Sequence, residues 1–87
     1  MEQWHSDWQS NLEDIKRQAI TELRPLVDQL DLPAEDKFDA LLLLIRTTDD
    51  STLIPAAHEA AKGIADGSRR AQALLDVIKE IDFFGRK

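Results

Sequence analysis

Two histidines are the side chains of this 87-residue chain best suited to act as a base: His5 near the N-terminus and His58 in "PAAHEAAK". Nucleophilic catalysis needs a serine, threonine or cysteine beside such a base, and no motif here supplies that pair. The stretch "DGSRR" lacks the strand and flanking glycines of a nucleophile elbow. A metal needs three or four ligands, whereas His58 and Glu59 are adjacent and face different ways. We therefore expect no enzyme and no metal or cofactor site.

Two adjacent arginines break a local rule of helix electrostatics. Arg69 and Arg70 follow Ser68, which we predict to be a helix N-cap, although the dipole at a helix start disfavours cations. One interpretation is that this stretch grips an anion or a partner's carboxylate, using the hydroxyl and free backbone N–H groups. The alternative, which we favour, is that the arginines pair within the chain with acidic residues of its first half, such as Asp28, Asp31 or Asp50.

Trp4 and Trp8 are four residues apart, so they share one face of a helix. Aromatic anchors dominate many protein interfaces, and this pair is therefore a candidate partner-binding site. The alternative is that the two rings close the core against Phe83 and Phe84 near the other terminus. We favour core closure and expect Trp4 to be the more exposed ring.

The run "ALLLLI" at residues 40–45 has more leucine than one helix face needs. An ordinary core stripe is formed by Phe38, Leu41, Leu42 and Ile45. Leu43 and Leu44 lie about 100° and 200° around the helix from Leu42, so at least one of them points away. Either the segment after Pro25 covers the surplus leucine, or a second chain covers an exposed apolar patch. We favour the interface and name both leucines as candidate partner-binding residues.

These residues must be positioned by helices, because apolar residues recur every three or four positions along the chain. The first helix begins at Ser6 or earlier. Pro25 must either kink it or start a separate segment over residues 25–31. A second helix opens at "DLPAED" and is expected to end near Thr47.

The third helix has Pro55 in its first turn and many alanines, which permit a close approach by a neighbouring backbone. We expect Gly67 to end it and Ser68 to cap the fourth helix. The core stripe of that last helix is then predicted to be Leu74, Leu75, Ile78, Ile81 and Phe84.

No alternating strand pattern or internal repeat is present. We therefore predict an all-α fold. It is a small antiparallel bundle of four main helices within a single domain of residues 1–87, the first helix being kinked or broken at Pro25.

Composition narrows the class of partner. The net charge is −6, with residues 1–50 at −7 and residues 51–87 at +1, so a nucleic-acid partner is not expected. Six consecutive apolar residues are too few to cross a membrane, and no signal peptide is seen. The chain has no cysteine, which is compatible with a reducing compartment. We expect a cytoplasmic protein.

These observations predict a small non-enzymatic interaction module, a regulator or adaptor that presents an apolar helical surface. Its partner is another protein chain, either a second copy in a homodimer or a basic partner. The alternative is an acidic inhibitor or immunity-type protein that neutralises a basic target. Salt separates the two, because screening weakens the inhibitor steeply and leaves apolar docking nearly unchanged.

Overall fold

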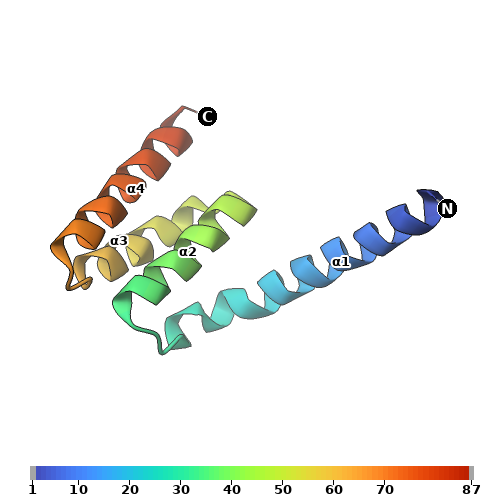
Figure 1. The fold of residues 1–87 in the computed structure, drawn as a ribbon, viewed down its shortest axis with the longest axis horizontal. Coiled ribbons are helices and arrows are strands. Elements are labelled where there is room, and N and C mark those ends of the chain that lie inside the picture. Colours follow the sequence, from blue (N-terminus) through green and yellow to red (C-terminus); the bar gives the residue numbers. More distant parts are fainter. Residues whose placement is uncertain (1, 87) are drawn as a thin grey trace. The chain divides into compact units, whose positions relative to one another are not determined.

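The computed structural model describes residues 2–86, and the side chains of residues 2–10 lie outside its described part. Within residues 2–86 the chain is helical and has no strand, which confirms the predicted all-α class (Figure 1). The elements are α1 (Glu2–Leu23), the 3-10 helix η1 (Arg24–Gln29), α2 (Ala34–Thr48), the 3-10 helix η2 (Ser51–Leu53), α3 (Ile54–Lys62) and α4 (Gly67–Gly85). They fall into two compact units, Met1–Leu30 and Asp31–Lys87.

The first unit contains α1 and η1, and Pro25 separates them. Proline has no N–H to donate to the carbonyl of Thr21, so the α-helical ladder stops and α1 ends at Leu23. The chain continues directly into η1, because Leu23 keeps right-handed helical dihedral angles. A separate segment therefore begins at Arg24, with Pro25 as its second residue. This segment is a 3-10 helix that ends at Gln29, two residues before the predicted end.

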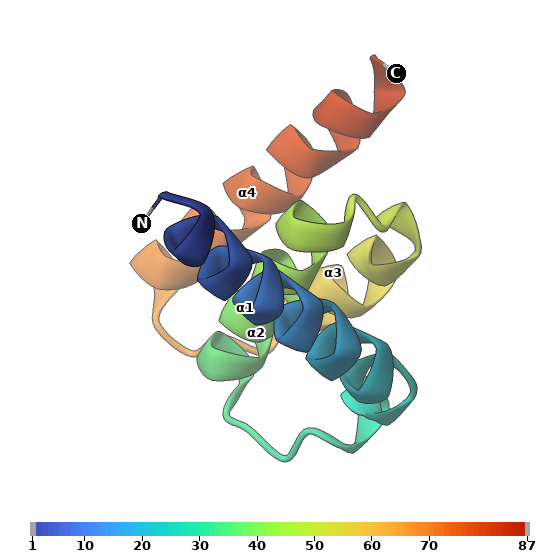
Figure 2. The ribbon, with the colours of Figure 1, turned by 90° about the vertical axis from the view of Figure 1, so that its right-hand side faces the viewer.

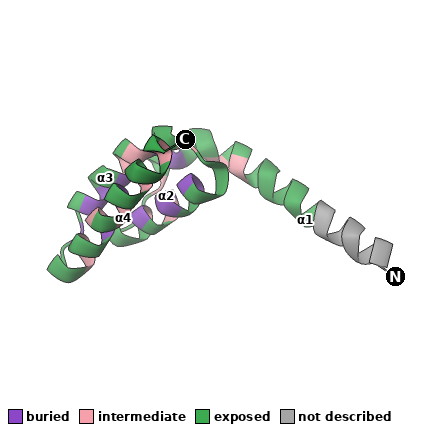
Figure 3. Cartoon of the chain, turned by 90° about the horizontal axis from the view of Figure 1, so that it is seen from above, coloured by how far each residue is buried: buried purple, intermediate pink, exposed green. Residues whose placement is uncertain are grey.

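The second unit is built around α3, which contacts both α2 and α4. The three helices alternate in direction along the chain (Figures 1 and 2). Figure 3 shows buried positions on the inner faces of α2 and α3. The buried apolar residues of the second unit are Phe38, Leu41, Leu42, Leu44, Ile45, Leu53, Ala57, Ala60, Ala61, Ile64, Ala73 and Val77.

Small side chains on α3 allow the close helix approach that the sequence predicts. Ala57, Ala60 and Ala61 are its buried residues. A Cβ placed on Gly63, which follows α3, would lie only 3.2 Å from the Cβ of Ala34 at the start of α2. The end of α3 and the beginning of α2 therefore meet, as expected for antiparallel neighbours.

The boundary between α3 and α4 differs from its prediction in two ways. Helix α3 ends at Lys62 with Gly63 as its C-cap, whereas Gly67 is the first residue of α4. The N-cap of α4 is Asp66, not Ser68, and its Oδ2 accepts a hydrogen bond of 2.8 Å from the backbone N–H of Arg69. Aspartate is a preferred N-cap because its carboxylate accepts an otherwise unpaired N–H.

Candidate functional site

Helix α4 leaves much of its predicted core stripe in solvent. Its buried residues are Ala73 and Val77. Leu74 and Phe84 are half-buried, while Leu75, Ile78 and Ile81 are 50%, 56% and 52% exposed. The short side chains of Ala73 and Val77 suit a close approach to the alanine-rich α3. The longer aliphatic side chains lie beside that contact and remain uncovered.

Ile78 and Ile81 line an apolar groove of about 560 Å³ between α3 and α4, whereas Leu75 lies outside it. Its lining residues are Ile54, Pro55, His58, Leu74, Val77, Ile78 and Ile81. All of them are apolar except His58. The four residues from α4 have i, i+3, i+4, i+7 spacing, so they form one helix face. The groove falls within the size range of ligand pockets, and its aliphatic lining suits an apolar side chain better than a charged one.

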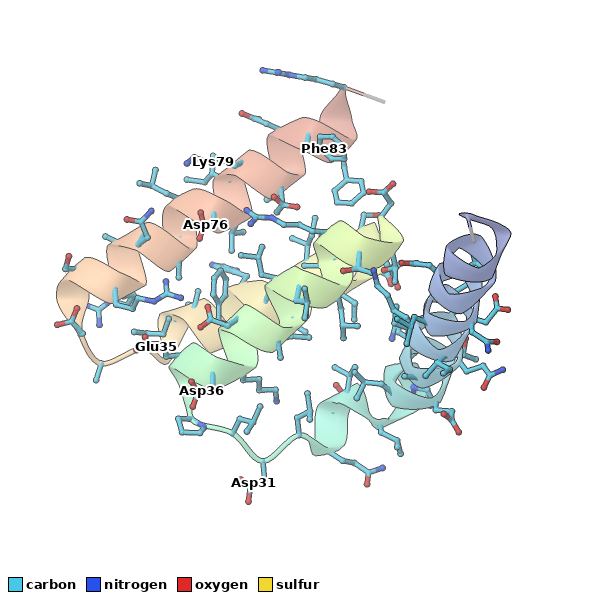
Figure 4. The ribbon with its side chains drawn as sticks, turned by 45° about the vertical axis from the view of Figure 1, so that its right-hand side comes forward. Asp31, Glu35, Asp36, Asp76, Lys79 and Phe83 are labelled. Atoms are coloured by element: carbon cyan, nitrogen blue, oxygen red, sulfur yellow. The ribbon has the colours of Figure 1, made fainter. Side chains whose placement is uncertain are left out.

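Charged residues of both signs lie on the two helices that form the groove, outside its lining. On α3, the Nζ of Lys62 lies 2.9 Å from Oε1 of Glu59, and this hydrogen bond and charge hold the pKa of Glu59 below its ordinary value. Asp76 and Lys79 follow one another along α4 (Figure 4). Of the described residues, no aspartate, glutamate, lysine or arginine lines the groove itself.

The groove is a site that the sequence prediction missed. The sequence predicts Pro55 in the first turn of a helix and offers His58 only as a base or a metal ligand. Their common position beside α4 depends on how α3 and α4 pack. A partial signal is present in the sequence, since the seven large apolar residues of α4, including Leu74, Leu75 and Ile78, span more than one narrow stripe.

The two candidate leucines of α2 have different environments. Leu44 is buried, with 5% of its surface exposed, whereas Leu43 is 66% exposed. The prediction that at least one of them points away from the core is confirmed. Leu44 packs in the core and presents no surface to a partner, so Leu43 is the remaining candidate.

Of the four aromatic residues predicted to close the core, the structure describes the side chains of the two phenylalanines. The side chains of Trp4 and Trp8 lie outside the described residues, and so does their predicted contact with Phe83 and Phe84. The two phenylalanine rings themselves meet edge to face, with centroids 5.5 Å apart at 79°. Phe83 is 49% exposed at the end of α4 (Figure 4).

Arg69 pairs within the chain, as the favoured interpretation predicts, but with different partners. Its Nη2 lies 2.6 Å from Oδ1 of Asp39, and its Nε lies 3.3 Å from Oε1 of Glu35. The guanidinium also stands 5.6 Å from the ring centroid of Phe38. These acidic residues belong to α2, with Glu35 in its first turn (Figure 4), and replace the predicted Asp28, Asp31 and Asp50.

Arg70 and Ser68, the other members of the predicted anion site, lie in different surroundings. Arg70 donates from Nη1 to the carbonyl oxygen of Ile64 at 2.9 Å, which holds the loop before α4. Ser68 is exposed in the first turn of α4. The two arginines thus use their donors on groups of the same chain.

Arg46 near the end of α2 makes a second cross-helix pair, with its Nε 3.2 Å from Oε2 of Glu80 on α4. This pair joins late positions of the two helices, and the Arg69 pairs join early ones. The ion pairs therefore connect α2 and α4 at both ends, and the two helices run in the same direction.

Among the described residues, no group of three or more histidine, cysteine or acidic side chains is placed to hold a metal ion. No helix in that part of the chain is long and apolar enough to cross a membrane. Comparisons with protein-family models, curated proteins and solved structures found no match to this chain. The groove between α3 and α4 is the candidate site that the geometry offers.

Proposed function

We propose that this chain is a non-enzymatic protein-interaction module of the cytoplasm, which binds a helical segment of a protein partner in the groove between α3 and α4. The observation that supports this most is the groove itself, about 560 Å³ in volume with an almost wholly aliphatic lining. Amphipathic helices bind such grooves by inserting anchors spaced i, i+3, i+4 and i+7.

The exposed aliphatic residues provide a driving force for docking. Ile78 and Ile81, which line the groove, are each about half exposed, and covering the exposed half of such a side chain contributes roughly 1 kcal/mol. Association costs several kcal/mol in lost freedom. These two residues therefore need a partner that also contacts the α3 side of the groove, at Ile54 and Pro55.

The test compares two α4 variants that differ only in the face they alter. Ile78→Glu places a charge at the groove, whereas Gln72→Glu adds the same charge at an exposed position on the opposite face of α4. Each variant, once shown to be folded by circular dichroism, serves as bait for native partner proteins at low and high salt. We expect the wild type and Gln72→Glu to retain the same partner at both salt levels and Ile78→Glu to lose it.

A Leu43→Glu bait distinguishes the groove from the exposed leucine of α2, which is the other candidate for partner binding. Loss of the partner with Leu43→Glu and retention with Ile78→Glu would move the site to α2 and contradict the proposed groove. Binding that survives both changes and disappears steeply with salt would favour the acidic inhibitor instead.

A further inference from the structure

Among the described residues, His58 is the one titratable side chain in the lining of the groove between α3 and α4. The other lining residues are Ile54 and Pro55 of α3 and four aliphatic residues of α4. None of these side chains can take up or release a proton. The charge of the groove lining therefore changes only at the imidazole of His58.

The charged groups next to His58 on α3 keep their charge over the pH range in which histidine titrates. Glu59 follows it directly, and the Nζ of Lys62 lies 2.9 Å from Oε1 of Glu59. The hydrogen bond and charge of Lys62 lower the pKa of Glu59, and the charge of a protonated His58 lowers it further. Both members of this pair stay ionised between about pH 5 and pH 8, whereas a histidine takes up its proton within that range.

An apolar occupant of the groove would remove water from the imidazole. His58 is exposed, so water solvates both of its protonation states. A neutral imidazole loses this water at a small cost, but a buried imidazolium is costly unless an acceptor pairs with it. The aliphatic side chains that line the α4 side of the groove provide no such acceptor. The two protonation states of His58 therefore differ in how well they tolerate an apolar occupant.

We propose that His58 makes occupancy of the groove sensitive to pH: the neutral imidazole permits an apolar occupant, and protonation releases it. This inference rests on the proposed function and adds the regulation of the same site. The occupant favours the neutral imidazole, so binding is strongest above the titration range of histidine and weakens as the pH falls through that range. The difference in affinity between the two protonation states drives the release.

The first measurement is the dissociation constant of Nile red, an uncharged apolar dye that becomes more fluorescent out of water, for the full chain. We expect this constant to rise at least about threefold between about pH 7.5 and about pH 5.5, because a histidine is then mostly protonated. Ile78→Glu adds a charge to the groove and should weaken binding of the dye at both pH values. That loss identifies the groove as the place where the dye binds.

Three variants attribute the pH response to one residue. His58→Gln has no proton to gain and should bind the dye equally at both pH values. His58→Arg carries a permanent charge and should bind weakly at both. His5→Gln removes the other histidine of the chain and should keep the wild-type response. Circular dichroism of every chain at both pH values separates loss of the dye from acid unfolding.

Three results would overturn the inference. The first is a wild-type affinity for the dye that is equal at the two pH values, and the second is a pH response that His58→Gln retains. The third is an absence of dye binding at both pH values, because the groove would then accept no apolar occupant to release. The proposed function fails separately, when Ile78→Glu still captures at about pH 7.5 the protein that the wild type captures.

Discussion

The charge of Arg69 stabilises the packing of α4 against α2. Its side chain is only 25% exposed, and it joins the first turn of α4 to Glu35 and Asp39 of α2. The guanidinium also lies 5.6 Å from the ring centroid of Phe38, within cation–π range, and Phe38 is fully buried. A cation near a helix start is unfavourable by itself. Two carboxylates and one aromatic ring offset that cost.

Replacing Arg69 by alanine should lower the free energy of unfolding by about 1–2 kcal/mol, because both ion pairs and the ring contact disappear. The effect stays modest since Glu35 and Asp39 are more than half exposed and are screened by water. Urea denaturation with and without added salt measures it, and salt should shrink the difference. Arg17→Ala, which removes an exposed i,i+3 pair of α1, is the control and should change little. Equal losses for the two variants would contradict the role assigned to Arg69.

At the scale of elements, α4 shows how a cap determines where a helix begins. The loop after α3 has two candidate caps, Asp66 and Ser68. Only the first accepts the backbone N–H of Arg69, at 2.8 Å. Ser68 lies inside the first turn, where its hydroxyl is not needed as a cap. The sequence predicts the N-cap of α4 at Ser68, two residues after the observed cap, Asp66.

Asp66→Ala should cost about 0.5–2 kcal/mol of stability, because it leaves an N-terminal N–H of α4 without its acceptor. Ser68→Ala should cost almost nothing, since alanine is the better helix former at an exposed position. Thermal and urea unfolding of the two variants make the comparison. A larger loss for Ser68→Ala than for Asp66→Ala would return the cap to its predicted position.

At the scale of the whole molecule, burial is concentrated in the second unit. Apart from Val27 of η1, every buried apolar residue in the described part belongs to Asp31–Lys87. Helices α2, α3 and α4 thus share a core, whereas most of the described α1 is exposed. The sequence predicts one domain over residues 1–87, and unfolding of the second unit alone tests that prediction.

A fragment of residues 31–87 should fold by itself, because it contains the core and both cross-helix ion pairs. We expect helical circular dichroism and a cooperative urea transition, with a low unfolding free energy that reflects its small size. A peptide of residues 1–30 should be only weakly helical in water, as isolated helices are. A disordered 31–87 fragment would support a single cooperative domain instead.

The sequence by itself determined the helical class, the four main helices and the break at Pro25. These features depend on local physics, namely the 3.6-residue apolar period, the missing N–H of proline and the small side chains of α3. The sequence also predicted that Leu43 or Leu44 of "ALLLLI" points away from the core, because helix geometry places the two leucines on different sides.

Only the tertiary structure decided which surfaces are covered. It placed Leu44 in the core and Leu43 in solvent, and it paired Arg69 with Glu35 and Asp39 rather than with any predicted partner. It also left the aliphatic edge of α4 exposed beside α3, which formed the groove. Periodicity along one chain identifies an apolar face. Its burial depends on the size and distance of side chains from another helix, and helix packing sets both.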